Sequence, residues 1–246
     1  MLKAIFNYKL IIHYDGTKYA GWQIQQNAVT IQQVISDAIR VIIKGNVNLI
    51  GSGRTDSGVH AIGQVANFKT HQKLDFYRFL YSLNSLLPRD IAIKKIEEAD
   101  SDFNARSDAK NRTYFYLITK YKSPFYERYS YFYHNEIDCD KLNNLSKSLT
   151  GKKDFTSFCR AISDTENKIC NVYNIQWKES KGLVFFIIDA DRYLHGMVRT
   201  IIGTLLNALK NNLDKKYIEE VFSAKDRAAA SEAVPAKGLF LFKVKY

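Results

Sequence analysis

The chain has few residues that bind metals or form disulfides. Its three cysteines, Cys139, Cys159 and Cys170, are far apart, and no two form a CxxC pair. This spacing indicates neither a cysteine zinc site nor a disulfide framework, and it fits a reducing, cytoplasmic location. The five histidines show no metal-ligand spacing. The cysteines and histidines therefore indicate no metal site.

The chain also lacks long apolar runs and linker sequences. No run is long enough to span a membrane. The first residues, "MLKAIFNYKLIIHYDG", are interrupted by Lys3, Asn7 and Lys9, so we expect no signal peptide. Only three prolines occur in 246 residues, and no Pro-, Gly- or Ser-rich stretch divides the chain. Two closely joined halves are therefore expected, rather than domains on a flexible tether.

Positive charge and aromatic rings are abundant. Lysine and arginine number 36 against 25 acidic residues, which gives a formal net charge of +11. Such an excess favours a polyanionic partner, because lysine and arginine neutralise phosphates. The 16 tyrosines and 15 phenylalanines add flat rings of the kind on which unpaired bases stack. Most of these rings are nevertheless expected in the core.

The first half of the chain predicts a β-α-β-β-α-β order. Thr30 and Gln33 have the spacing of a capping box at the start of the first helix, and Asp75 can cap the second, which Pro88 stops. This order is the ferredoxin-like pattern. The predicted strands are 7–14, 47–50, 63–70 and 91–98, and the predicted helices are 30–43 and 75–87.

The second half repeats this rhythm. Residues 129–134 are expected to add a further strand or a loop, and Gly151 to end the first helix of this half. We therefore predict an α+β protein with two ferredoxin-like halves, 1–104 and 105–246, that share a mainly antiparallel sheet around a central cleft. The predicted strands of the second half are 112–119, 171–177, 183–191 and 238–246, and its predicted helices are 140–151, 194–210 and 215–224.

One loop combines glycines with charge. "GSGRTDSGVHA", residues 51–61, places Arg54 and Asp56 two positions apart among three glycines, with His60 following. A surface Arg–Asp pair would contribute little. An ordinary turn, however, needs only one or two special residues. Arg54 beside Asp56 would lower the pKa of that carboxyl and keep it ionised, and the glycines would let a ligand approach the backbone. The loop is therefore a candidate for a catalytic carboxylate.

Two better-known loop signatures do not fit. "GTKYAG" has the glycine spacing of a phosphate-binding loop, but Trp22 and Gln23 follow where lysine and serine or threonine are required. "GSGRTDSG" lacks the third glycine of the dinucleotide fingerprint and the helix after it. Neither nucleotide-binding class is supported.

The loop resembles the GRTDxGVHA signature of the tRNA pseudouridine synthase A family. "YDGTKYAGWQIQ" (14–25) resembles the family's YDGTxYxGWQ segment, and "FNARSDAKNRTYFY" (103–116) resembles its FxARxxAxxRxYxY segment. Three further blocks match in order, and the likeness spans essentially the whole chain. They are "DFTSFC" (154–159), "YLHGMVRTIIGTLL" (193–206) and "VPAKGLFL" (234–241).

The resemblance implies a function and a set of site residues. It implies the pseudouridine synthase fold, and a homodimer that isomerises uridine to pseudouridine at positions 38, 39 and 40 of the tRNA anticodon stem-loop without metal or cofactor. Asp56 matches the family's catalytic aspartate, and Tyr114 its active-site tyrosine. We expect Arg54 to pair with Asp56 or with a phosphate of the substrate. We expect Arg199, in an apolar helix, to pair with Asp56, unless it extends along the surface into solvent. Tyr116, Phe155 and Phe158 are expected in the core.

Two rival functions remain open at this stage. A tandem RNA-binding module shares the strand order, but it predicts a Lys/Arg-Gly-aromatic run that neither "GQVANFKT" nor "LVFFIIDAD" contains. A hydrolase of N-glycosides would also use an aspartate in a cleft, but it normally needs a second carboxylate. The sequence shows no such partner for Asp56.

Overall fold

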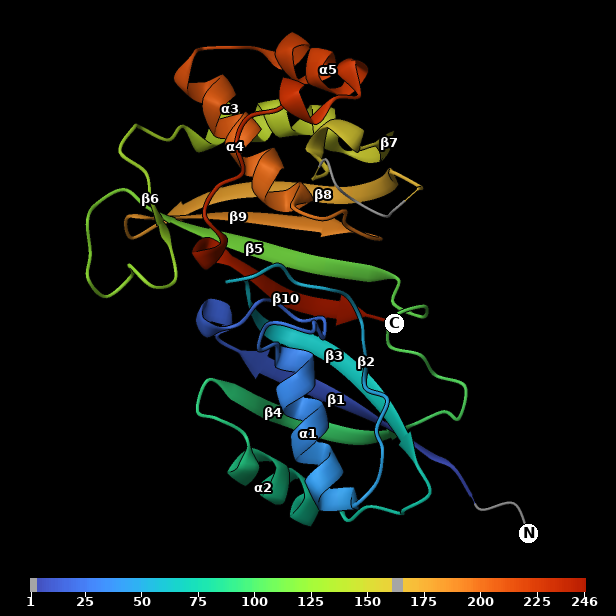
Figure 1. Cartoon of the computed structure of the whole chain (residues 1–246). Helices are drawn as coiled ribbons and strands as arrows, with labels where there is room; N and C mark the ends of the chain where they lie inside the picture. Colours follow the sequence, from blue (N-terminus) through green and yellow to red (C-terminus); the bar gives the residue numbers. More distant parts are fainter. Residues whose placement is uncertain (1–3, 161–165) are drawn as a thin grey trace. The chain divides into compact units, whose positions relative to one another are not determined.

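The computed structural model describes residues 4–160 and 166–246 and divides the chain into two compact units. Unit 1 comprises Met1–Lys110 and Leu241–Tyr246, and unit 2 comprises Asn111–Phe240. The chain is α+β, as predicted, with helices and antiparallel strands in both units (Figure 1). The predicted halves, 1–104 and 105–246, and the cleft between them stay predictions.

Unit 1 has the predicted β-α-β-β-α-β order. Its strands pair in the order β4-β1-β3-β2, and every pair is antiparallel, which is the ferredoxin-like arrangement. β2 is much shorter than β3, so the first residues of β3 extend beyond it. The elements are β1 (Phe6–Tyr14), α1 (Ile31–Ile43), β2 (Ile50–Gly51), β3 (His60–Thr70), α2 (Phe76–Leu86) and β4 (Ile91–Ala99).

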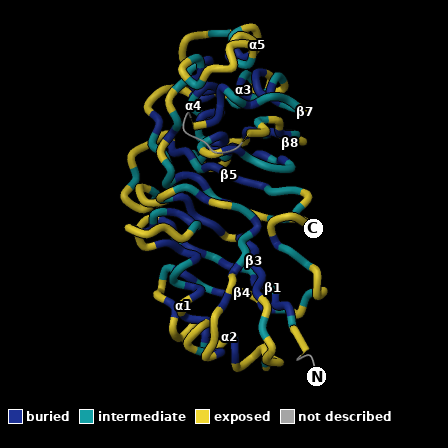
Figure 2. The backbone as a smooth tube through the Cα atoms, turned by 45° about the vertical axis from the view of Figure 1, so that its right-hand side comes forward, coloured by how far each residue is buried: buried dark blue, intermediate teal, exposed yellow. Residues whose placement is uncertain are grey.

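Both helices of unit 1 begin at the predicted caps. The Thr30 side chain accepts a hydrogen bond from the Gln33 backbone N–H, and the Asp75 side chain accepts one from Arg78. The reciprocal half of the capping box does not form, because the Gln33 amide donates to Asp37 at 2.7 Å instead. The apolar stripe of α1 is buried, while Tyr77 on the outer face of α2 is exposed. Figure 2 colours the backbone of both helices by burial.

Unit 2 also contains a row of antiparallel strands. Its strands pair in the order β5-β9-β8-β7, and β6 adds a short parallel pairing to β5. The helix predicted for 140–151 forms as α3 and a 3-10 turn, Lys147–Leu149, which ends just before Thr150 and Gly151. α3 ends at Ser146, and Gly151 (φ +93°) begins a strand that the sequence did not indicate. The elements are β5 (Asn111–Thr119), β6 (Tyr131–Phe132), α3 (Cys139–Ser146), β7 (Gly151–Asp154), β8 (Ile169–Ser180), β9 (Leu183–Ala190), α4 (Met197–Lys210) and α5 (Lys215–Ala224).

β10 (Leu239–Lys245) belongs to both units. Leu239 and Phe240 pack with unit 2, whereas residues from Leu241 onward pack with unit 1. In unit 1, the backbone carbonyl of Phe242 lies against Gly63 of β3, where a Cβ would come within 2.0 Å of that oxygen. Glycine at position 63 therefore allows the end of the chain to approach β3 closely.

Candidate active site

The glycine-framed loop connects β2 to β3 of unit 1. The exposure of its charged residues differs. Arg54 is exposed, Asp56 is half-buried, and Thr55 between them is buried. The loop closes on itself through a hydrogen bond from the Val59 N–H to the Asp56 carbonyl, at 3.2 Å. The Asp56 side chain is therefore carried by an ordered turn and is partly accessible to solvent.

Glycines in this loop are required by close packing and by backbone conformation. A Cβ on Gly51 would lie 2.5 Å from the indole of Trp22, which is itself buried. Gly58 has φ +75°, a conformation that residues with a Cβ rarely adopt. From the sequence, we expected the glycines to let a ligand approach the backbone. At Gly51, the group that approaches the backbone is the indole of Trp22.

The segment from Tyr14 to Trp22 supports the loop from one side. The Trp22 N–H donates to the Thr55 carbonyl at 3.1 Å, and the Gly58 N–H donates to the Tyr19 carbonyl at 3.4 Å. Gly21 (φ +91°) makes this contact possible, because a Cβ there would lie 2.4 Å from the Thr55 carbonyl oxygen. Two sequence blocks that are separated along the chain, "YDGTKYAGWQ" and "GSGRTDSGVHA", therefore form one structural unit.

Buried side chains hold the loop from the other side. The hydroxyls of Tyr14 and Thr55 are hydrogen-bonded at 2.9 Å. The Gln64 amide of β3 accepts from the Ser52 hydroxyl at 2.7 Å and donates to the Gly53 carbonyl at 2.9 Å. Burial raises the pKa of Tyr14 well above its usual value, so its hydroxyl stays protonated. Sequence reasoning assigned no role to Tyr14, Thr55 or Gln64, although all three lie within or beside the two blocks.

His60, which follows the loop, is a buried anchor. Its Nδ1 accepts a hydrogen bond from the Gly16 N–H at 3.1 Å, and the Asp15 carboxylate lies 3.1 Å from the same nitrogen. A Cβ on Gly16 would lie 2.0 Å from the Val59 carbonyl oxygen, so the two chain segments touch here as well. His60 is 1% exposed and attaches the start of β3 to the turn after β1.

Tyr114 and Arg199 belong to unit 2. Tyr114 lies on β5, is buried, and packs its ring edge-on against Tyr193 at 5.0 Å between centroids. Arg199 lies on α4, is half-buried, and donates from Nε to the Val234 carbonyl at 2.7 Å. The Val234 N–H donates in turn to the Arg199 carbonyl at 3.2 Å. The expected pairing of Arg199 with Asp56 stays a prediction, as does the pairing of Arg54 with Asp56.

The aromatic residues predicted for the core are there. Tyr116, Phe155 and Phe158 are fully buried, and Tyr116 donates its hydroxyl proton to the Pro235 carbonyl at 2.8 Å. Phe155 and Phe158 pack against Phe222 with ring centroids 5.2 Å and 5.1 Å away.

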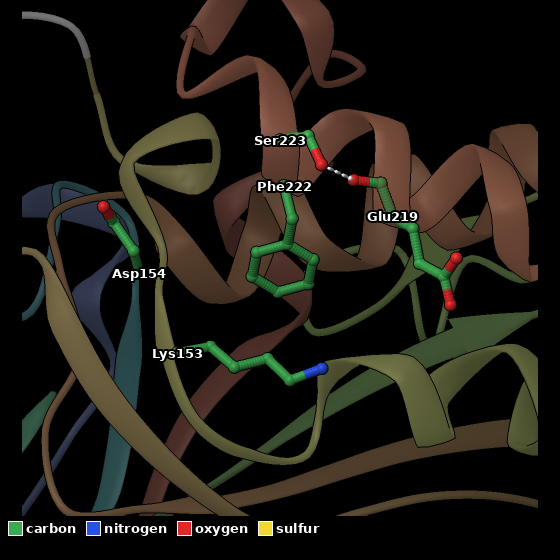
Figure 3. A pocket seen from close by; sticks show the side chains of 5 residues that line it. All are labelled: Lys153, Asp154, Glu219, Phe222 and Ser223. Atoms are coloured by element: carbon green, nitrogen blue, oxygen red, sulfur yellow. Dashed lines mark hydrogen bonds between the residues drawn. The ribbon is translucent and has the colours of Figure 1, made fainter.

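A surface hollow of about 330 Å³ lies in unit 2 and contains none of the predicted site residues (Figure 3). Its Lys153 ammonium lies 5.2 Å from the centre of the Phe222 ring. Asp154 is hydrogen-bonded to Thr156, which holds the pKa of its carboxyl below the usual range, and it is paired with Lys225 at 3.2 Å. The charges of this hollow are mixed, so it does not match the polyanion site predicted from composition.

The structure describes residues 4–160 and 166–246. In this part of the chain, no group of three or more histidine, cysteine, aspartate or glutamate side chains could hold a metal ion. Within the same residues, no helix is long and apolar enough to cross a membrane.

The chain matches known proteins over nearly its whole length. The family model described as tRNA pseudouridine synthase matches residues 10–108 and 145–246. A protein named tRNA pseudouridine synthase A from Caldicellulosiruptor bescii is 42% identical over 242 residues, covering 98% of this chain and 99% of that protein. One of the same name from Bacteroides fragilis is 38% identical over 245 residues, covering 99% of this chain and 97% of the other.

A distant likeness concerns a solved structure, "Crystal structure of the archaeal box H/ACA sRNP Nop10-Cbf5 complex". It has a TM-score of 0.36 and 16% identity, covering 81% of this chain and 43% of that one. The family model and the curated relatives agree with each other. On their evidence, this chain belongs to the tRNA pseudouridine synthase family and is an isomerase that converts uridine to pseudouridine in tRNA.

Proposed function

We propose that this enzyme acts at positions 38, 39 and 40 of the tRNA anticodon stem-loop, with Asp56 as its catalytic carboxylate. The observation that carries the assignment is the loop itself. Asp56 is half-buried, on a turn whose neighbouring residues are held by hydrogen bonds to Tyr14, Trp22 and Gln64. A carboxylate held in an ordered, solvent-reachable turn suits chemistry that requires a fixed direction of attack.

The reaction explains why a single carboxylate is needed. The N1–C1′ bond of uridine breaks, the uracil rotates, C5 bonds to C1′ and loses its proton, and N1 takes up a proton. A carboxylate serves this sequence as a nucleophile at C1′, as a nucleophile at C6, or as a base at the C2′ proton. Each role requires Asp56 to be ionised. The target nucleotide must also leave the stack to reach the loop.

Three other residues have proposed roles in substrate binding. Arg54 is exposed beside Asp56, which suits a contact to the carboxylate or to a flanking phosphate. Tyr114 supplies a ring for stacking on the uracil. Arg199 supplies positive charge for Asp56. We also propose that the enzyme works as a homodimer in the cytoplasm.

The test measures tritium release from anticodon-arm tRNA that carries uridine labelled at C5. We expect release by the wild-type chain and none by Asp56→Ala, while tRNA affinity stays close to wild type, because the change removes no positive charge. Asp37→Ala is the matched control, since Asp37 is an exposed aspartate of α1 in the same unit. Substantial release by Asp56→Ala would remove Asp56 from its role. Substrates with uridine at only one of the three positions test the choice of target.

A second test concerns the partner. The net charge of +11 predicts that tRNA affinity falls steeply with salt concentration, because each phosphate contact releases a counterion. Filter binding between about 50 and 200 mM salt measures this slope. A flat dependence would argue against phosphate contacts.

A further inference from the structure

We propose that the buried pair of hydroxyls on Tyr14 and Thr55 is a positioning device that sets the direction of the Asp56 side chain. The proposal rests on the proposed role of Asp56. It assigns no chemistry to Tyr14 or Thr55 themselves. Both act through the residue that follows Thr55 in the chain.

Thr55 is held through both its side chain and its backbone carbonyl. Its hydroxyl is bonded to the Tyr14 hydroxyl at 2.9 Å, its carbonyl accepts from the Trp22 N–H at 3.1 Å, and Gly21 presses against the same carbonyl. Its side chain points into the protein, and those of Arg54 and Asp56 on either side are more exposed. Because the side chain and the backbone of Thr55 are both fixed, the direction of the Asp56 side chain that follows it is fixed as well.

Tyr14 is a rigid reference point for this contact. It is the last residue of β1, the strand that pairs with both β3 and β4, where Tyr14 lies opposite Ala61 and Ile91. Its ring is buried 6.1 Å from the ring of Trp22. A strand paired on both sides moves less than a loop, so the Tyr14 hydroxyl ties the loop to the sheet.

The buried setting makes this bond selective. A hydroxyl that loses its partner in the interior costs about 1–3 kcal/mol, so other loop conformations that break the pair are disfavoured. Gln64 adds to this selection, because its amide holds Ser52 and Gly53 on the preceding turn of the loop. The bond thus restricts the loop to the conformation in which Asp56 is half-buried.

The experiment separates positioning from general stability. Tyr14→Phe and Thr55→Val each remove one hydroxyl and keep the shape of the side chain. Tyr8→Phe is the matched control. Tyr8 lies on the same strand, is fully buried, and bonds through its hydroxyl to Gln72 and Leu74. Thr55→Ser keeps the hydroxyl and serves as the conservative rescue. Each variant is measured for single-turnover tritium release at saturating enzyme, tRNA affinity and melting temperature.

We expect Tyr14→Phe and Thr55→Val to slow the single-turnover rate by about tenfold or more, with tRNA affinity unchanged. A displacement of a catalytic group by about 1 Å can lower the rate by about a hundredfold. The double variant should be no slower than the worse single variant, since both remove the same bond. Tyr8→Phe should lower the melting temperature without slowing turnover, and Thr55→Ser should stay near the wild-type rate.

Other results would overturn the proposal. A rate that follows melting temperature across Tyr14→Phe and Tyr8→Phe would reduce the pair to a structural role, and an unchanged rate in Tyr14→Phe would remove its role entirely. Should Thr55→Val fail to fold, Tyr14→Phe, Thr55→Ser and Tyr8→Phe still decide. Asp56→Ala separates the two proposals. Activity in that variant contradicts the proposed function, whereas its inactivity alongside a fully active Tyr14→Phe contradicts only the positioning role.

Discussion

The two units make the same hairpin connection in different ways. In unit 1 the hairpin joins β2 to β3 through residues 52–59, which include Asp56. In unit 2 it joins β8 to β9 through Lys181 and Gly182 alone, with φ values of +51° and +76°. Two positive φ angles in a two-residue loop match the turn that suits the twist of antiparallel strands.

The difference lies in what supports each connection. β8 and β9 are long and paired to their ends, so the tight turn of unit 2 needs little beyond the ladder. β2 has only two residues, and the loop that follows it is held by Tyr14, Trp22 and Gln64 instead. A long loop without ladder hydrogen bonds offers more positions for functional side chains than a tight turn does. It also needs additional contacts to stay ordered.

The largest expected effect on turnover follows from removing the negative charge of Asp56 in the long loop. Asp56→Asn keeps the shape of the side chain and removes its charge, so we expect turnover to fall by about 10³-fold or more. Lys181→Gln in the tight turn should leave turnover unchanged. Tritium release measures both variants. Comparable activity in the two variants would erase the functional difference between the hairpins.

The next effect concerns the contact between the long loop and its support. Gly21→Ala places a methyl group 2.4 Å from the Thr55 carbonyl oxygen in a backbone with φ +91°. We expect a loss of about 3 kcal/mol in the free energy of unfolding and slower turnover, because Thr55 must move. Urea unfolding and single-turnover rates measure the two effects. Wild-type values of both would show that the loop does not depend on this contact.

A smaller effect is expected in the tight turn. Gly182→Ala also introduces a Cβ at positive φ, but the nearest atom, 2.9 Å away, belongs to the Tyr121 side chain, which can move. The expected cost is about 1–2 kcal/mol of stability, with no change in turnover. Thermal unfolding and tritium release together check this prediction, and slower turnover at full tRNA binding would contradict it.

The smallest expected effect is an increase in thermal stability. Lys181 occupies φ +51°, a region that asparagine tolerates better than lysine. Lys181→Asn creates the Asn-Gly pair preferred in such turns and should raise the melting temperature by about 1–2 °C, since 1 kcal/mol shifts a protein of this size by about 2–4 °C. A lower melting temperature would mean that the Lys181 side chain makes a contribution of its own.

Local signals in the sequence were sufficient for much of the fold. Thr30 and Asp75 act as helix caps where their spacing predicted them, and the apolar stripe of α1 is buried. α5 spans the predicted residues 215–224. At Gly151 the prediction was incomplete, because this residue follows the end of the helical turn and also begins β7, and only the pairing of β7 with β8 reveals the strand.

The sequence proposes Asp56 as the reactive residue, which stays a prediction, but it does not indicate what supports the loop around Asp56. Asp56 was identified by the glycine-rich block and by its family resemblance. The Tyr14–Thr55 contact joins residues 41 positions apart, and a bond of that separation leaves no periodic or local signal in one sequence. Tyr14 was an ordinary strand residue in the pattern, and Gln64 an ordinary polar position.

The division of β10 has a consequence for biosynthesis. Residues 241–245 complete unit 1 from the far end of the chain, where the Lys110 N–H donates to the Lys245 carbonyl at 2.9 Å and the Tyr246 hydroxyl donates to the Ala105 carbonyl at 3.0 Å. A ribosome must therefore translate all of unit 2 before the unit that carries Asp56 receives its last strand. A nascent chain stalled before Leu241 would expose an unfinished edge at β3, so unit 1 is completed only after unit 2 has been synthesised.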